Sequence, residues 1–544
     1  MTDCARSAAH LRRLTFTATT ILCLVALAVT PASAQGRKAR LSADLADHVA
    51  ARREASVRVI VQGSDDQVQT LATRYGAKVT TKLRTGSVLE VTGGQLWALS
   101  EDPDVAHLSG DVPVTRMMAV TATSTGADQV WAGIEGLKGS SGRGIGVAVV
   151  DSGIAASHKA LQGRVMASVD FTGASGRDGY GHGTHVAGII AGSPAGGFGG
   201  MAPGAHLVSL KVLGDDGSGH KSDVINAIDW AVQNRAAYNI RVINLSLGHP
   251  VFESWQDDPL CQAVERATRA GIVVVASAGN FGKTADGMPV IGGIVSPGNS
   301  PSALTVGALN TKGTARRSDD VMATYSSRGP TQFDLLLKPE IAAPGNRVAS
   351  AAGQGSYLAK NFPERMVSGH GANAYMEMSG TSMAAAAVSG AVALLLEARP
   401  ELTPADAKVA LQLTSAPVEG AGLIEAGAGS LNVLAALLFV SGDAGIASTV
   451  IAEEEIALSG LSLNTAHQSS LGADLHAYIL VWGNGLVWGN DTILDGDLLQ
   501  SNILVWGNGL VWGNGLVWGN GLVWGNGLVW GNGLVWGNGL VAAD

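Results

Sequence analysis

The sequence predicts an α/β protein with a mostly parallel β-sheet and helices on both faces of that sheet, flanked by a small α+β unit and a repeat tail. Two observations predict the sheet: continuous apolar runs, typical of strands buried on both faces, and segments of helical spacing between them. A hexapeptide repeat near the C-terminus predicts the tail. The apolar runs are residues 144–150, 207–212, 242–247 and 272–276.

Composition and charge narrow the classes of function. The 544 residues include 73 glycines, and 46% of the chain is hydrophobic with a formal net charge of −9, which excludes a wholly disordered protein. The last basic residue is Lys408, and 11 acidic residues follow it. An acidic tail without basic groups repels phosphate, so nucleic-acid binding there is not expected. We interpret these acids as groups that keep an apolar tail soluble.

Residues 1–34 are predicted to be a signal peptide. Arg6, Arg12 and Arg13 form a basic start, residues 14–30 are apolar, and residues 32–34 form a small-residue cleavage site. A membrane anchor is the alternative, but the apolar run is short for a span. We therefore expect a secreted, extracellular protein without a transmembrane segment, and we leave retention at the cell surface open.

The cysteines exclude a disulfide framework. Cys4 and Cys23 lie in the predicted signal peptide, which leaves Cys261 alone in the mature chain. An exported protein with one cysteine depends on a large core for its stability. We expect Cys261 to be a small buried hydrophobic side chain, since free cysteines are among the most buried residues.

Residues 56–112 predict a small ferredoxin-like unit, because strands and helices are expected there in the order βαββαβ. The expected strands are residues 57–61, 77–81, 87–92 and 105–108, and the expected helices are residues 65–75 and 95–100. Residues 117–138 are expected to be a loose connector. Further helices are expected at residues 223–234, 259–270 and 383–397, with closing helices and loops over residues 403–436.

Three short motifs carry residue types that catalyse hydrolysis. Asp151 ends a buried strand, where open α/β sheets bind ligands. His182 lies between two glycines where a helix begins, and Ser382 begins a long alanine-rich helix. A serine there lies over unpaired backbone N–H groups and the positive end of the helix dipole.

These three residue types form a nucleophilic system. A serine hydroxyl attacks only when a base removes its proton, and histidine is such a base near neutral pH. A buried carboxylate holds the imidazole tautomer and stabilises the imidazolium. Singly, Asp151 would be a turn residue, His182 a core histidine and Ser382 a helix cap. Together, in these contexts, they predict a catalytic triad.

The chain resembles the subtilases, the subtilisin-like serine peptidases, whose triad has the chain order Asp, His, Ser. The likeness covers roughly residues 126–436 of a predicted catalytic domain at residues 126–440. It implies a subtilisin-like α/β fold and catalytic roles for Asp151, His182 and Ser382. The motifs that carry it are residues 147–154, 181–188, 246–248, 277–280, 325–330, 338–340, 343–345, 380–384 and 428–432.

The resemblance also implies residues that bind the substrate. Asn280 would donate its side-chain amide to the tetrahedral oxyanion beside the backbone N–H of Ser382. Residues 246–248 resemble the strand that pairs with the substrate backbone and lines the first specificity pocket, and residues 277–279 precede Asn280 in the same implied site. The residues implied are Ser246, Leu247, Gly248, Ser277, Ala278 and Gly279.

Residues 56–112 are similar in order and position to the subtilase propeptide, an inhibitor and folding chaperone. This implies a zymogen whose partner is its own propeptide, cut by Ser382 between Val112 and Thr125. The chain departs from the family at Ala386, where a proline is usual, and at Ala160, where many relatives have a calcium-ligating aspartate. No cofactor is expected for the chemistry, and structural calcium is left open. His185 has no partner at zinc-ligand spacing, so a structural role is expected.

The C-terminus is predicted to be an acidic linker at residues 441–479 and a hexad tail at residues 480–539, in which Leu-Val-Trp-Gly-Asn recurs. Hexapeptide repeats can form a parallel β-helix, here with three hexads in each coil. A ladder of short strands with Asn-Gly turns and an unstructured, self-associating tail are the alternatives. Rows of tryptophan would suit glycan, neighbouring chains or the cell surface as partners.

Taken together, the sequence predicts an exported serine endopeptidase, made as a self-processing zymogen, that cleaves polypeptide substrates through an acyl-enzyme. The alternative is a surface adhesion or assembly protein with a vestigial peptidase domain. Labelling of the processed chain by a serine-directed fluorophosphonate would distinguish the two.

Overall fold

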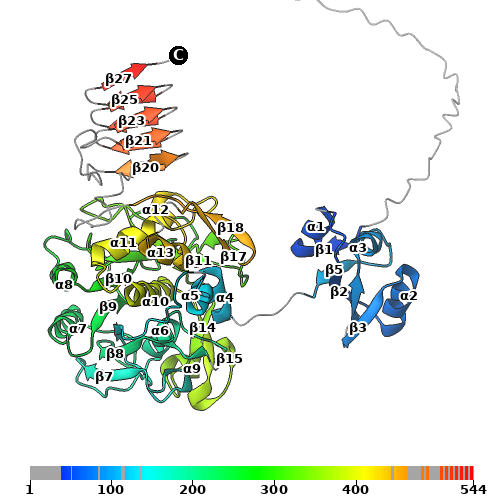
Figure 1. Ribbon diagram of the computed structural model, residues 1–544, viewed down its shortest axis with the longest axis horizontal. Helices are drawn as coiled ribbons and strands as arrows, with labels where there is room; N and C mark the ends of the chain where they lie inside the picture. Colours follow the sequence, from blue (N-terminus) through cyan, green and yellow to red (C-terminus); the bar gives the residue numbers. More distant parts are fainter. Residues whose placement is uncertain are drawn as a thin grey trace, which may run out of the picture. The chain divides into compact units, whose positions relative to one another are not determined.

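The computed structural model describes residues 38–462, except 51, 84–85, 112–116, 135, 195–196 and 443–445, and it describes the backbone of strands between residues 480 and 542. The chain divides into two compact units, Met1–Val114 and Thr115–Asp544 (Figure 1). The predicted signal peptide lies outside the described residues.

The first unit contains a five-stranded sheet in the order β1-β5-β2-β4-β3. From β2 to β5 its elements follow the order that the sequence predicts, and β1 and α1 precede them. Ser64 and Thr92 begin α2 and α3 with capping boxes completed by Gln67 and Gln95. The elements are β1 Arg40–Leu41, α1 Ala43–Ala50, β2 Val57–Gln62, α2 Asp65–Tyr75, β3 Lys78–Leu83, β4 Gly86–Val91, α3 Gly93–Ser100 and β5 His107–Gly110.

The second unit contains an eight-stranded sheet in the order β12-β11-β10-β9-β6-β8-β7, with β13 beside β11. All neighbours pair in parallel except β12, which is antiparallel to β11, so the predicted mostly parallel sheet is confirmed. Strand β9 ends two residues before its expected end, which leaves Ser246 and Leu247 beyond the sheet. The strands are β6 Gly146–Asp151, β7 Val165–Asp170, β8 His206–Lys211, β9 Ile240–Leu245, β10 Val273–Ser277, β11 Leu304–Asn310, β12 Val321–Met322 and β13 Ile341–Pro344.

Helices cover both faces of this sheet, as predicted. Alternate residues of β6 face opposite layers: Val147 and Val149 pack with α6 and α10, whereas Ala148 and Val150 pack with α7 and α8. Among the described residues, only α10 is long and apolar enough to cross a membrane, and 83% of that stretch is buried inside the protein. The helices are α6 His182–Ala191, α7 Lys221–Gln233, α8 Pro259–Arg269 and α10 Thr381–Ala398.

Smaller elements complete the second unit around the ends of the main sheet. Strands β14, β16 and β15 form a separate antiparallel sheet. The remaining elements are η1 Lys159–Leu161, β14 Val348–Ala351, α9 Tyr357–Asn361, η3 Pro363–Arg365, β15 Met366–Ser368, η4 Gly371–Asn373, β16 Tyr375–Met378, α11 Pro404–Leu413, α12 Leu423–Ala426 and α13 Val433–Val440.

The expected loose connector at residues 117–138 is wrong. The structure has two helices there, α4 (Met117–Ser124) and α5 (Ala127–Ala132). Ala122, Ala127 and Val130 are buried in the main core. These small side chains lack a long amphipathic pattern, so tertiary packing rather than local sequence determines that this segment is helical.

The expected linker at residues 441–479 is wrong for its first half. Strands β17 (Ser448–Ile451) and β18 (Glu454–Ala457) form an antiparallel hairpin, and Ile451 and Ile456 join the main core. The Glu454 carboxylate accepts a hydrogen bond from the Arg317 backbone N–H at 2.6 Å. The acidic residues here therefore include one with a structural contact to the segment that precedes β12. Residues 463–479 lie outside the described residues.

The tail strands pair in parallel, but the expected coil of three hexads is wrong. Leu504 pairs with Leu516, twelve residues later, so one coil contains two hexads. The strands form two stacked sheets, β19-β21-β23-β25-β27 and β20-β22-β24-β26 (orange to red in Figure 1). They are β19 Leu480–Trp482, β20 Gly485–Trp488, β21 Ile503–Trp506, β22 Gly509–Trp512, β23 Gly515–Trp518, β24 Gly521–Trp524, β25 Gly527–Trp530, β26 Gly533–Trp536 and β27 Gly539–Ala542.

A buried charge cluster joins the edge of the main sheet to α11. The Glu340 carboxylate lies 2.5 Å from the Lys338 ammonium and 2.7 Å from the Lys408 ammonium. Lys338 also donates to the carbonyls of Ser300 and Ala303. Burial lowers the pKa of Lys338 to about 7, although the Glu340 charge opposes that shift. Glu340 is therefore the counter-ion that makes two buried cations tolerable.

We predict that Glu340→Ala lowers the free energy of unfolding by ~3–5 kcal/mol, because both ammonium groups lose their buried counter-ion. Urea unfolding of the purified protein measures this change. Asp229→Ala is the matched control, because it removes an exposed ion pair with Arg266 and should change stability far less. Similar small losses in both variants would contradict the prediction.

Candidate active site

Asp151 is the last residue of β6 and its side chain is fully buried. The continuous apolar strand before it places the carboxylate at the carboxyl edge of the sheet. One of its oxygens accepts a hydrogen bond from the Ser152 backbone N–H at 2.7 Å. The strand thus brings a charged group to the edge where ligands of open α/β sheets bind.

His182 is the first residue of α6, and its Nδ1 atom lies 2.8 and 2.9 Å from the two carboxylate oxygens of Asp151. A side chain at Gly183 would come within 2.2 Å of the Gly153 carbonyl, so this close approach requires glycine. Burial of the ring favours the neutral form, but the charge and hydrogen bonds of Asp151 outweigh burial and raise the pKa of His182 above its ordinary value. The Nε2 side of the ring remains available for proton transfer.

Asp178 is a site residue that the sequence analysis missed. Its buried carboxylate accepts hydrogen bonds from the backbone N–H groups of Gly181 and Thr184 and from the hydroxyls of Ser152 and Thr184. Burial raises the pKa of Asp178 above its ordinary value, although these hydrogen bonds oppose the shift. It connects the start of α6 to the end of β6. The available signal was an acid four residues before a predicted helix start, where carboxylates satisfy free N–H groups.

Ser382 is the second residue of α10 and is partly exposed. Its hydroxyl donates to the Ser246 carbonyl at 3.0 Å, and the Ser246 hydroxyl donates to the Ser382 carbonyl at 2.8 Å. To give its proton to His182, the Ser382 hydroxyl must turn away from the Ser246 carbonyl. Catalytic hydrogen bonds of this kind often tighten only when substrate is bound.

A buried chain of hydrogen-bonded side chains holds the backbone at Ser382. The Ser389 hydroxyl donates to the Asn244 side-chain carbonyl at 2.9 Å, and the Asn244 amide donates to the Ser246 hydroxyl at 2.9 Å. Asn244 and Ser389 are both fully buried. The chain connects β9 to α10 through satisfied hydrogen bonds, so it holds the backbone at Ser382 without leaving a polar group unpaired.

Asn280 has a side-chain orientation that follows from its partners. Its Oδ1 atom accepts hydrogen bonds from the Thr381 backbone N–H at 3.0 Å and the Thr381 hydroxyl at 3.2 Å. The opposite end of the amide, Nδ2, is therefore the end available to a ligand. The N–H of Ser382 lies in the first turn of α10, where N–H groups have no partner within the helix.

The residues expected to bind substrate lie together at this edge. Strands β9 and β10 are parallel neighbours, so residues 246–248 and 277–279 follow adjacent strand ends. The Ser277 hydroxyl donates to the Leu247 carbonyl, and the Gly279 N–H donates to the Thr381 hydroxyl. Leu247 is half-buried, Gly248 is exposed, and Ser277, Ala278 and Gly279 are buried. The structure thus places the residues expected to bind substrate at the same sheet edge as Ser382.

His185 and Cys261 have surroundings typical of structural residues. His185 is buried beside Met376, its Nε2 atom lies 3.0 Å from the Met376 carbonyl, and burial lowers its pKa to about 3. Cys261 is buried, and burial raises the pKa of its thiol. Within residues 38–462, as far as they are described, His, Cys, Asp and Glu form no group of three that could hold a metal ion.

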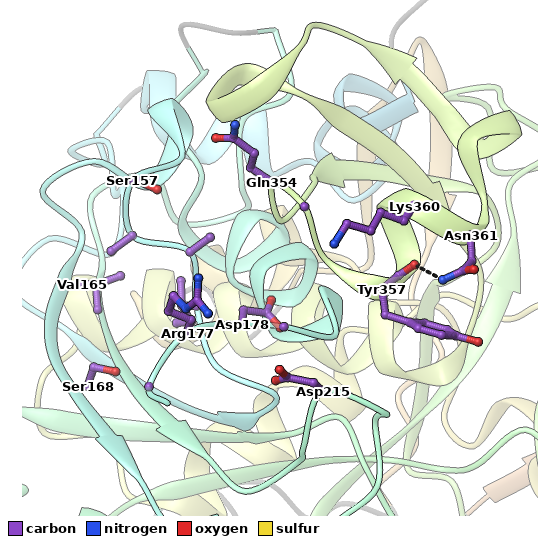
Figure 2. A pocket seen from close by; sticks show the side chains of 16 residues that line it. Ser157, Val165, Ser168, Arg177, Asp178, Asp215, Gln354, Tyr357, Lys360 and Asn361 are labelled. Carbon is purple, nitrogen blue, oxygen red and sulfur yellow. Dashed lines mark hydrogen bonds between the residues drawn. The ribbon is translucent and has the colours of Figure 1, made fainter. Parts of the chain in front are cut away.

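A polar pocket of about 730 Å³ lies next to Asp178. Figure 2 shows Arg177, Tyr357 and Lys360 among the side chains around it. The Tyr357 backbone N–H donates to the Gly179 carbonyl, and the ring of Tyr357 stacks on Tyr180. These contacts attach α9 to the loop that precedes His182. The pocket therefore lies beside the segment that leads into α6.

Comparison with known proteins places this geometry in a family. The model of the "Subtilase family" matches residues 142–434, more than half of the chain. The chain is 40% identical over 285 residues to "Serine protease AprX" of Bacillus subtilis. The matched residues make up 50% of this chain and 61% of that protein. It is 36% identical over 319 residues to "Subtilisin E" of Bacillus subtilis, and the matched residues make up 58% of this chain and 72% of that protein.

A third relative is "Extracellular serine proteinase" of a Thermus species, 34% identical over 354 residues, which covers 63% of this chain and 75% of that protein. The matches to these relatives span between 61% and 75% of their own lengths. The family match, these identities and the arrangement around Ser382 agree. The chain therefore belongs to the subtilase family, the subtilisin-like serine endopeptidases.

Proposed function

We propose that this chain is an exported serine endopeptidase, made as a zymogen, that uses Asp151, His182 and Ser382 as its catalytic triad. The observation that carries the proposal is the pair of short contacts between the Asp151 carboxylate and His182 Nδ1. This contact sets the tautomer that leaves Nε2 free to accept a proton, and it stabilises the imidazolium that forms.

The reaction follows from the chemistry of these groups. The Ser382 oxygen attacks the carbonyl carbon of the scissile peptide bond as His182 Nε2 takes the hydroxyl proton. The imidazolium then donates that proton to the leaving amine, and the C–N bond breaks to leave an acyl-enzyme. Water, deprotonated by the same ring, attacks the ester carbonyl and releases Ser382 with its proton restored.

Charge develops on the carbonyl oxygen during both attacks. The Asn280 amide and the Ser382 backbone N–H are the proposed donors to this oxyanion, and the positive end of the α10 dipole adds to them. Thr381 supports this role because its two donors hold the opposite end of the Asn280 amide. A neutral donor held in place before the reaction needs no reorientation as the charge forms.

Export and processing are also part of the proposal. The pattern of residues 1–34 supports a signal peptide, and one relative is named an extracellular serine proteinase. Residues 56–112 are proposed as the inhibitory propeptide, which Ser382 would cut off between Val112 and Thr125. The tail, proposed to be a surface or self-association module, is compatible with retention at the cell surface.

The second candidate function is surface adhesion or assembly with a vestigial peptidase domain, and the repeat tail favours it. A vestigial site would not need the satisfied polar chain beneath Ser382 or the oriented amide of Asn280. These features favour the enzyme, and covalent labelling of Ser382 distinguishes the two functions.

We predict that Ser382→Ala abolishes both fluorophosphonate labelling and processing, because the variant lacks the hydroxyl oxygen that attacks the carbonyl carbon. Intact-mass measurement of the purified variant should find residues 56–112 still attached. Ser379→Ala, an exposed serine three residues earlier, is the control and should retain both properties. Normal processing of the Ser382 variant would contradict self-cleavage, and an unlabelled wild-type enzyme would favour the adhesion function.

We predict that Asn280→Leu lowers kcat by roughly 10²–10³ with little change in KM, because the amide interacts with the oxyanion only in the transition state; the magnitude was measured for the corresponding donor of a subtilisin. Steady-state kinetics on a peptide substrate measures the change. Thr381→Ser keeps the hydroxyl that orients Asn280 and should remain close to wild type. A change confined to KM would assign Asn280 to ground-state binding instead.

We predict that kcat/KM falls as the pH is lowered through a value above ~6.5, the ordinary pKa of histidine, because only the neutral His182 ring accepts the serine proton. The midpoint is expected above the ordinary value because Asp151 favours the protonated ring and raises the pKa of His182. A pH profile recorded where circular dichroism shows folded protein measures this midpoint. A midpoint at or below the ordinary histidine value would contradict the proposed Asp151–His182 pair.

A further inference from the structure

The pocket of about 730 Å³ is lined by the loop that precedes His182 and by the start of α9. Residues 176–179, which lead into α6, form one wall together with residues 154–157, which follow β6. The opposite wall belongs to the segment 354–361. The volume falls within the usual ~300–1,000 Å³ of pockets that hold a ligand, and the mechanism at Ser382 leaves this pocket unused.

Backbone hydrogen bonds hold the two walls together. The Tyr357 N–H donates to the Gly179 carbonyl at 2.8 Å. The Leu358 N–H donates to the Tyr180 carbonyl at 3.0 Å. Because Gly179 precedes His182 by three residues, their Cα atoms are at most ~11 Å apart. An extended polypeptide bound at the site therefore reaches this pocket with residues about three to five positions from the scissile bond.

The two acidic side chains that line the pocket already have partners. The buried Asp178 carboxylate accepts hydrogen bonds from backbone and hydroxyl groups around the start of α6. Asp215 accepts a hydrogen bond from the Lys211 ammonium at 3.0 Å. That ammonium also donates to the Arg177 carbonyl at 2.8 Å. Both acids are therefore engaged by groups of the pocket wall.

The two cationic side chains of the pocket, Arg177 and Lys360, have no such partners. Figure 2 shows them on opposite sides of the pocket, with Lys360 turned toward the space between them. In the part of the chain that the structure describes, neither the guanidinium nor the ammonium has a hydrogen bond or an ion pair, and the Gln354 amide has no hydrogen bond. A guanidinium matches both oxygens of a carboxylate, so these donors suit a carboxylate ligand.

We propose that this pocket, which we call the Arg177–Lys360 pocket, is an accessory site that binds acidic side chains of a polypeptide substrate a few residues away from the scissile bond. This rests on the proposed peptidase function. The carboxylate would lie between the two cations, and the apolar wall at Ile154, Ala155 and Val165 would contact the aliphatic part of a glutamate side chain. Polypeptides with acidic residues at this distance from the cleaved bond are therefore the preferred substrate class.

Hydrolysis of two pairs of internally quenched peptides tests this inference. In one pair, the residues about three to five positions after the scissile bond are glutamate or glutamine, and in the other pair the same change lies before the bond. The wild-type enzyme should have a KM ~3–10-fold lower for the glutamate peptide of at least one pair, with similar kcat, because the pocket binds ground state and transition state alike. Added salt should reduce this difference. Equal KM values in both pairs would overturn the proposal.

Two variants and a matched control assign the effect to the pocket. Arg177→Gln and Lys360→Gln change exposed side chains, so the fold should persist, and each should bring the ratio of the two KM values close to one. Arg365→Gln removes the same charge from η3, outside the pocket, and should keep the wild-type ratio. An unchanged ratio in both pocket variants, or an equal loss in Arg365→Gln, would refute the role of the pocket.

Failure of this inference is distinguishable from failure of the peptidase function. An enzyme that cleaves glutamate and glutamine peptides alike, and is labelled by a fluorophosphonate, would refute only the Arg177–Lys360 pocket. An enzyme that cleaves none of the peptides and is not labelled would refute the peptidase function itself.

Discussion

The burial of α10 is the constraint on which the site depends. This helix contacts β9, β10, β11 and β13 on the sheet, as well as α6 and α13. Most of its side chains are fully buried. A helix packed on so many sides has one position, so the packing of the core, and not a loop, locates Ser382 and the positive end of the helix dipole. The polar chain from Ser389 through Asn244 to Ser246 adds a directional bond to this packing.

The acid–base residues reach the same sheet edge from the neighbouring elements β6 and α6. Strands β10, β9 and β6 are neighbours, and their carboxyl ends supply the segments of Ser277, Ser246 and Asp151. His182 reaches this edge from α6, with Asp178 connecting the helix start to Ser152. Parallel strands align their carboxyl ends, so residues more than 100 positions apart meet without a long connecting loop. This arrangement lets short motifs carry the whole site.

Local sequence was sufficient where a motif and its secondary structure occur together. The apolar run before Asp151 predicted a buried strand, and the glycines around His182 predicted a close turn into a helix. Long-range pairs were not predictable in this way. The Glu454 contact with Arg317 joins residues 137 positions apart, so the acidic segment resembled a linker. Asp178 belongs to the same class, because an ordinary aspartate acquires its role only from neighbours that folding brings close. The helices α4 and α5 were missed because small apolar residues have weak periodicity.

The two-hexad coil of the tail has a consequence for its evolution. Successive hexads alternate between the two stacked sheets, as the parallel register of β21 with β23 and of β22 with β24 shows. Gain or loss of one hexad would move every later strand to the opposite sheet, whereas gain or loss of two would preserve each strand's partners. The twelve residues between the second and third intact copies equal one such coil. We therefore expect the tail to gain or lose hexads in pairs. An even change in the number of hexads keeps every later strand in its own sheet.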